Sequence, residues 1–193
     1  GTHIIVDMVY SPDGMHLASS LYGGEVWVWN TLTGKRVHVL NHGETSGIPG
    51  LAFSPDGSLL AQGGREEGVV VWDTDSGEVR YVLPEPEHTN EHVAFSADGS
   101  LLAVLDDMMT ANGNVSLWDA STGESIEVDR RNTSNTYQIQ SMFMFDPRQN
   151  IIASGYSDGM VRIIDPVDDA LLLKFQAHQG PVDYLDYSPD GSL

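Results

Sequence analysis

Residues 50–83, GLAFSPDGSLLAQGGREEGVVVWDTDSGEVRYVL, decide the fold class of this 193-residue chain. Short alternating or apolar runs are separated by turn residues, and no window of useful length shows the 3.6-residue period of a helix. In the phrase SPDG, proline presets the first turn residue and glycine accepts a positive φ. The run VVVW is β-branched and apolar, as expected of a strand buried on both faces. The stretch therefore predicts four short strands joined by tight turns.

The same pattern recurs along the chain in three series that stay in phase. The aromatic residues before the first turn are spaced by 43, 42, 50 and 42 residues, and they are Tyr10, Phe53, Phe95, Phe145 and Tyr187. The third strands end in dipeptides at Trp29-Asn30, Trp72-Asp73, Trp118-Asp119 and Ile164-Asp165. Five residues after the first residue of each dipeptide, the next turn contains Gly34, Gly77, Gly123 or Asp169. Three phased series at one period indicate a repeat architecture, and the expected class is all-β.

On these residues the chain resembles the WD-repeat β-propellers. The resemblance rests on the Trp-Asp and Trp-Asn dipeptides and on FQAHQGPVDYLDYSPDG at 175–191. The sequence pattern SPDGSLLA is similar to that of bacterial members of the family. It implies four-stranded blades over 3–41, 48–84, 91–129 and 139–176, with an incomplete fifth blade over 181–193. Propellers close with roughly four to eight blades. We therefore expect residues 1–193 to form one partial β-propeller domain, an open arc of a ring of about seven blades.

The resemblance also implies a structural role for the repeat motif. WD-repeat blades typically contain a His–Ser/Thr–Asp–Trp hydrogen-bond network, which is patchy here: Ser19 and Ser154 fit it, whereas Gln62, Val104 and Ile164 depart from it. The residues assigned to the structural motif are Trp29, Asn30, Trp72, Asp73, Trp118, Asp119, Asp158, Asp165 and His178. Because no unit completes the network, we expect stability to depend on apolar packing by the residues two before each aromatic: Met8, Leu51, Val93, Phe143 and Leu185.

Composition limits the possible partners and location. The formal net charge of −19 is spread over the chain and would repel a phosphate backbone, so nucleic acid is not expected as a partner. A basic protein partner is compatible with this charge. No apolar run approaches the ~18 residues needed to span a bilayer, and the first residues do not resemble a signal peptide. Cysteine is absent, so no disulfide holds the fold, and this leaves the redox compartment undetermined. From the missing signal peptide and membrane span we expect a cytoplasmic location without membrane insertion.

The sequence does not favour catalysis, a metal or a cofactor. His88 and His92 are four residues apart, which would suit a metal pair on a helix, but they fall in a loop that enters a strand. The acidic stretch at 73–78 resembles the start of a calcium loop but lacks the downstream bidentate glutamate. No Ser-His-Asp arrangement occurs in a convincing context. We therefore expect no catalytic residues, no metal ligands and no cofactor.

The lengths of the connections between strands distinguish the two ends of each repeat and indicate which end carries the binding face. The first and third turns are constant, whereas the second connection and the link between units vary, with insertions at 106–113 and 130–138. In an antiparallel four-stranded unit these two variable connections emerge on the same face, here called the loop face. Insertions concentrated on one face of a repeat array usually mark the binding face. The predicted partner-binding residues there are Tyr22, Arg65, Met108, Met109, Arg130, Arg131 and Tyr156.

The sequence thus predicts a non-catalytic protein–protein interaction scaffold that binds a protein or peptide through this loop face. Methionine, aromatic and arginine side chains on exposed loops suit adaptable protein contacts. One alternative is an accessory or regulatory propeller of a larger signalling enzyme, such as a kinase, protease or NTPase, whose catalytic part lies outside this chain. A second alternative, a propeller enzyme with a site at its channel, is disfavoured because the hydrolase motifs are missing. Whether the chain is the interaction scaffold or the accessory propeller, missing blades or further domains of the full-length chain are expected partners.

Overall fold

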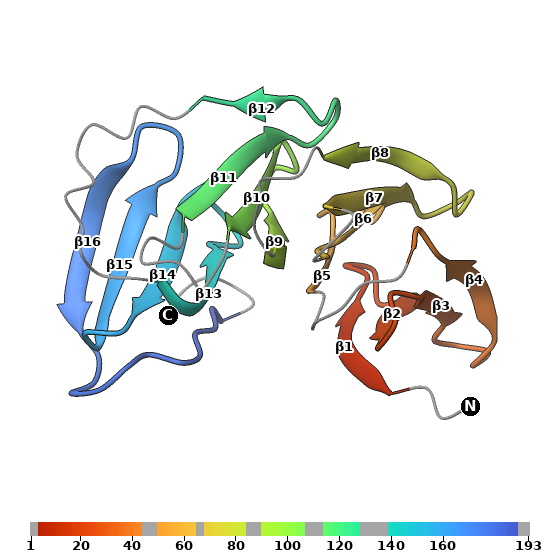
Figure 1. Cartoon of the computed structure of the whole chain (residues 1–193), viewed down its shortest axis with the longest axis horizontal. Coiled ribbons are helices and arrows are strands. Elements are labelled where there is room, and N and C mark those ends of the chain that lie inside the picture. Colours follow the sequence, from red (N-terminus) through yellow and green to blue (C-terminus); the bar gives the residue numbers. More distant parts are fainter. Residues whose placement is uncertain are drawn as a thin grey trace. The chain divides into compact units, whose positions relative to one another are not determined.

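The computed structural model describes residues 4–43, 50–64, 68–83, 90–106, 114–127 and 139–188. These residues form four four-stranded sheets, ordered β1-β2-β3-β4, β5-β6-β7-β8, β9-β10-β11-β12 and β13-β14-β15-β16 (Figure 1). The strands are β1 (Ile5–Tyr10), β2 (His16–Leu21), β3 (Val26–Asn30), β4 (Arg36–Leu40), β5 (Leu51–Phe53), β6 (Leu59–Gln62), β7 (Val69–Asp73), β8 (Val79–Leu83), β9 (Asn90–Phe95), β10 (Leu101–Asp106), β11 (Asn114–Asp119), β12 (Ser125–Ile126), β13 (Ile139–Phe145), β14 (Ile152–Tyr156), β15 (Met160–Asp165) and β16 (Ala170–Gln176). The prediction of an all-β fold made of four-stranded repeats is confirmed. None of the described segments forms a helix with the length and hydrophobicity needed to cross a bilayer.

The chain divides into two compact units, Gly1–Phe95 and Ser96–Leu193. In the first unit, one core joins the sheets β1–β4 and β5–β8. Its buried members are Ala18, Val26, Val28 and Leu40 from the first sheet and Leu51, Leu60, Val70 and Trp72 from the second. Two polar contacts cross the same boundary: Asp7 accepts the Leu51 N–H at 2.9 Å, and the Gln62 amide donates to the Gly24 carbonyl at 3.2 Å. The apolar runs of the third strands therefore form the interior.

Among the residues described in the first unit, no sheet packs on the other face of the sheet β1–β4. The strand register aligns Met8, Ser19, Trp27 and Val39 across the four strands, so these side chains lie on that face. Met8 is 57% exposed, and Val39 is 48% exposed. The prediction that Met8 packs like its counterparts is therefore wrong, although three of those counterparts are buried: Leu51, Val93 and Phe143.

In the second unit, the sheet β13–β16 is the most completely described. Its register runs from Phe145↔Ile152 to Ile139↔Tyr156 between the first two strands, with an irregularity between Ile139 and Phe143. Ile152 and Phe143 are fully buried and supply its apolar interior. The last strand, β16, extends to Gln176 and pairs along the whole length of β15. This pairing brings Gln176 opposite Met160, next to the β14–β15 turn.

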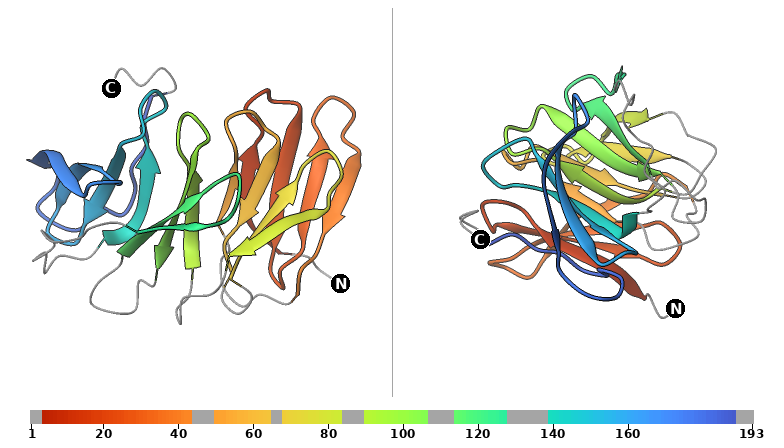
Figure 2. Two further views of the ribbon diagram at one scale, coloured as in Figure 1. Left: turned by 90° about the horizontal axis from the view of Figure 1, so that it is seen from above. Right: turned by 90° about the vertical axis from the view of Figure 1, so that its left-hand side faces the viewer.

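The constant turns are closed by short hydrogen bonds from the repeated residues. In the first turn of the second sheet, the Ser54 hydroxyl donates to Asp56 at 2.6 Å and accepts the Leu59 N–H at 2.9 Å. The turns β1–β2 and β3–β4 lie together at one end of their sheet in Figure 2.

In the fourth repeat, Asp169 stands where the other repeats have glycine, and its φ of 55° keeps the same left-handed backbone. Aspartate tolerates this conformation better than most non-glycine residues.

A strand is not found where the sequence predicts the start of a fifth repeat. Residues 181–188 are described but are not assigned to a strand. Val182 nevertheless contacts the fourth sheet, since it is 3% exposed and its N–H donates to the Tyr156 carbonyl at 3.2 Å.

Candidate interaction surface

Tyr22 lies in the β2–β3 connection, at the loop end of the first sheet. The turn is held by three backbone hydrogen bonds: the Tyr22 N–H donates to the Ile4 carbonyl at 2.8 Å, the Gly24 N–H to the Leu21 carbonyl at 3.0 Å, and the Leu21 N–H to the Glu25 carbonyl at 2.8 Å. The Tyr22 side chain is 67% exposed. The fixed backbone therefore presents a large amphipathic side chain to solvent, which suits a protein contact.

Tyr156 occupies a different position from Tyr22 in its repeat. It is the last residue of β14 rather than a turn residue, and it is only 7% exposed. The Arg162 guanidinium lies over its ring, 3.8 Å from the ring centroid. Burial raises the pKa of the Tyr156 phenol, while the adjacent arginine opposes the shift. Tyr156 therefore packs in the interior at the loop end of the fourth sheet, and its side chain contributes little to the exposed surface.

The remaining predicted partner-binding residues are outside the described residues. They are Arg65, Met108, Met109, Arg130 and Arg131. Most of both insertions, which carry four of these residues, also falls outside the described ranges. Their assignment to the loop face stays a prediction.

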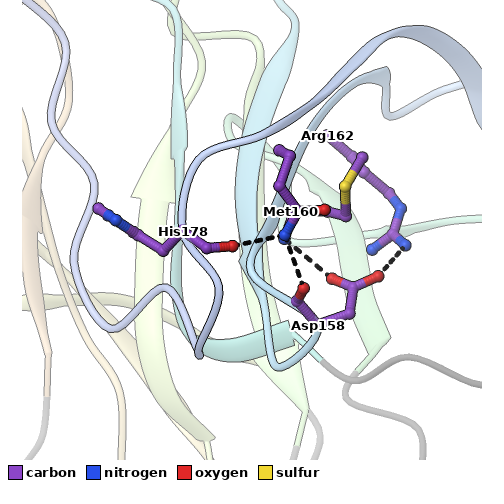
Figure 3. Close-up of polar contacts among 5 residues, drawn as sticks. Asp158, Met160, Arg162 and His178 are labelled. Carbon is purple, nitrogen blue, oxygen red and sulfur yellow. Dashed lines mark hydrogen bonds and ion pairs between the residues drawn. The ribbon is translucent and has the colours of Figure 1, made fainter.

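Asp158 in the β14–β15 turn forms a part-buried ion pair with Arg162 in β15. Arg162 Nη2 lies 2.9 Å from Asp158 Oδ2, and Arg162 is 7% exposed. Asp158 Oδ1 accepts the Met160 N–H at 3.0 Å, so one carboxylate closes the turn and pairs the arginine (Figure 3). The arginine is buried and the carboxylate is part-buried, with 20% of its side chain exposed, so the pair is largely but not wholly shielded from water.

The segment after β16 is bound to the same turn. The Gln176 amide donates to the Asp158 carbonyl at 3.0 Å and also to the His178 carbonyl. The N–H groups of Ala177 and His178 both donate to the Gly159 carbonyl, at 3.0 and 3.1 Å. His178 contributes its backbone to these contacts, and Figure 3 shows its side chain extending away from Asp158.

The indole hydrogen bonds differ among the repeats. Trp29 Nε1 donates to Ser19 Oγ at 3.2 Å, which matches the Ser–Trp part of the network implied by the resemblance. In the third repeat, Val104 has no hydroxyl, and Trp118 Nε1 instead donates to Ser116 Oγ at 3.2 Å. Sequence reasoning missed Ser116; the available signal was a serine two residues before the tryptophan, on the same face of the strand.

The fourth repeat lacks an indole altogether. The Ile164 side chain has no N–H to donate, and Ser154, at the position of Ser19, is fully buried. Ser154 is directly opposite Arg162 in the register, so the two side chains share a face. The charged cluster thus occupies the face on which the first repeat places Trp27 and Trp29. Sequence reasoning also missed Arg162.

The second residue of each dipeptide, aspartate or asparagine, closes the third turn. Asp73 Oδ1 accepts the Ser76 N–H at 2.9 Å and its hydroxyl at 2.8 Å, and these bonds lower the pKa of Asp73. The same position accepts backbone N–H groups at 2.9–3.0 Å in the other repeats, through Asn30, Asp119 and Asp165. Among the described residues, no group of three His, Asp or Glu side chains is placed to hold a metal ion.

Asp98 lies in the β9–β10 turn, one of the turns of constant length at the end of a sheet opposite the loop face. Its hydrogen bonds predict a pH dependence of stability. Asp98 accepts hydrogen bonds from the N–H and hydroxyl of Ser100, from the Asn150 amide and from the Ser96 hydroxyl, which together hold its pKa well below the ordinary value. A carboxylate with a lowered folded-state pKa stabilises the fold above its unfolded pKa, and this stability is lost as the pH falls through the acid range. We therefore expect Asp98→Asn to flatten the loss of thermal stability below about pH 4, measured by melting curves over a pH series.

Asp75→Asn is the matched control for Asp98→Asn, because it removes one charge from an exposed side chain in the β7–β8 turn. If both variants change the acid slope equally, net charge rather than the hydrogen bonds of Asp98 explains the effect.

Comparison with known proteins gives a consistent result. The family model described as "WD domain, G-beta repeat" matches residues 34–73 and 131–165. No curated protein sequence matches the chain significantly. The fold is similar to the solved structure of U3-55K, with 20% identity and a TM-score of 0.76 over 95% of this chain and 55% of that chain. It is also similar to the β-propeller domain of Cps50 (Swd1) from Myceliophteria thermophila, with 16% identity and a TM-score of 0.79 over 98% of this chain and 62% of that chain.

The WD40 repeats of RRP9 give a third match, with 19% identity and a TM-score of 0.73 over 95% of this chain and 54% of that chain. At these identities the likeness shows the fold alone. The chain spans 54–62% of the length of the three structures it resembles.

Proposed function

The chain belongs to the WD40-repeat β-propeller family, and on that premise we propose that it is a non-catalytic scaffold that binds a protein or peptide partner through its loop face. Members of this family commonly bind proteins, and their propeller domains are typically non-catalytic. The observation that most supports the loop face is Tyr22, which is 67% exposed on a turn held by backbone hydrogen bonds. A fixed backbone with an exposed aromatic side chain loses little entropy on binding.

The proposed contact residues are Tyr22 together with Arg65, Met108, Met109, Arg130 and Arg131, from the variable connections. Arginine, methionine and tyrosine are enriched in protein interfaces. The net charge of −19 favours a partner with a basic surface, because complementary charge accelerates encounter and disfavours acidic competitors.

Site-specific photo-cross-linking tests the proposed face directly. A photo-reactive amino acid is placed at Tyr22 or, as the matched control, at Leu32, which is 83% exposed in the β3–β4 turn at the other end of the same sheet. Each variant is irradiated in cells that express the protein naturally. We expect position 22 to form a discrete cross-linked product at least several-fold more strongly than position 32.

Competition shows whether the product reflects specific binding. Excess unlabelled chain should abolish the product at position 22. A product at position 32 alone, or equal products at both positions, would place the contact away from the loop face.

A further inference from the structure

Within the fourth repeat, the residues that join the β14–β15 turn to the segment after β16 form one connected group. The turn supplies the Tyr156, Asp158 and Gly159 carbonyls as acceptors. The segment supplies the Ala177, His178 and Val182 N–H groups, and Gln176 adds its side-chain amide. This group of contacts is called the latch below.

The latch leaves no room for an added side chain at its centre. A Cβ built on Gly159 would lie 2.2 Å from the His178 carbonyl oxygen and 2.7 Å from that of Gly180. A Cβ on Gly155 would lie 2.7 Å from a Val182 side-chain atom. The segment therefore lies directly on the backbone of the turn and of β14.

Residues 179–181 lie between the backbone contacts of Ala177 and His178 and that of Val182. Residues 177–181 are all exposed, whereas Val182 is 3% exposed. The segment is thus held at both ends and open to solvent in the middle, at the loop end of the fourth sheet. A segment fixed in this way presents its surface to a partner without a large ordering cost.

We propose that Arg162 is a positioning residue that sets this segment for partner contact by fixing the turn on which the segment lies. Its guanidinium holds the Asp158 carboxylate from one side and packs on the Tyr156 ring from the other. Asp158 and Tyr156 also provide two of the backbone carbonyls that bind the segment. In the first repeat, the equivalent residue is Trp27, whose indole donates to Glu25 at 3.0 Å, so the arginine arrangement is specific to the fourth repeat. The role in partner contact rests on the proposed function, whereas the positioning itself does not.

Residue-level hydrogen exchange in the full chain tests the positioning role. We expect Arg162→Met to accelerate exchange of the Ala177, His178 and Val182 amides at least tenfold, with a much smaller effect on β13 and on the part of β14 farthest from the turn. The control is Ile152→Ala, a buried truncation at the far end of β14, which should accelerate exchange throughout the sheet. An even increase across the sheet in Arg162→Met, or no change at the three amides, would overturn the proposal.

Two further variants keep the test decisive if Arg162→Met does not fold. Arg162→Lys retains the charge but loses the planar stacking and the forked donors, so an intermediate acceleration at the same amides is expected. Gln176→Ala removes a side-chain donor of the latch and leaves the ion pair intact, and it should accelerate exchange at Ala177 and His178. If both variants match the unmodified chain at these amides, the latch does not hold the segment. Because exchange is measured without a partner, a negative cross-linking result at Tyr22 leaves this test unaffected.

Discussion

Replacing Trp72 with alanine is expected to destabilise the chain by about 3–5 kcal/mol, measured by chemical denaturation. Trp72 is 1% exposed and lies in the core shared by the first two sheets, in the same cluster as Val28 and Leu40. Removing the indole leaves a cavity between two sheets that cannot close without moving both.

Trp29→Ala is the matched control, because Trp29 holds the same place in the first repeat. It lies on the uncovered face of the sheet β1–β4, is partly exposed and donates one hydrogen bond to Ser19. Losing that bond and part of the apolar contact should cost about 1–2 kcal/mol. An equal loss of stability in the two variants would contradict the placement of the core on only one side of the first sheet.

Replacing Gly159 with alanine is expected to destabilise the fourth repeat by about 2–5 kcal/mol, from a left-handed backbone and a steric conflict combined. Its φ is 78°, and the added Cβ would meet two backbone carbonyl oxygens that belong to the segment after β16. Backbone atoms cannot rotate away as a flexible side chain can, so the segment must move. Thermal and chemical denaturation of the full chain measure the loss.

Gly14→Ala separates the two contributions to the Gly159 effect. Gly14 has a similar φ of 69°, but an added Cβ would meet nothing within 4 Å. Only the conformational cost of about 1–2 kcal/mol should appear there. If Gly159→Ala costs no more than Gly14→Ala, the close approach of the segment to the turn is not present in solution.

The repeated turns explain why the fold could be predicted from the sequence. Their conformations depend on local chemistry: serine and aspartate bond within the turn, and glycine supplies the left-handed residue. Even the exception at Asp169 keeps a positive φ of 55°. The order of strands within each sheet then follows from short antiparallel connections.

The parts that could not be predicted depend on contacts between elements. Met8 has the pattern of a core residue, but pattern alone does not show whether a second sheet covers its face. Ser116 and Arg162 occupy the same repeat position as Trp27, where the residue type changes from one repeat to the next. Their roles arise from side-chain partners across the strands, which a repeat alignment based on Trp and Asp does not reveal. Tyr22 and Tyr156 are both predicted for the loop face, but Tyr22 follows β2 whereas Tyr156 is the last residue of β14. A shift of one residue reverses which side of the sheet a side chain faces.

Hydrogen-exchange footprinting of the complex formed with the partner captured through position 22 tests the central claim most directly. Binding through the loop face predicts protection at the β2–β3 turn around Tyr22 and Gly24, with unchanged exchange in the β1–β2 and β3–β4 turns of the same sheet. Protection confined to the β1–β2 and β3–β4 turns, with none around Tyr22, would contradict the assignment of this face as the binding surface.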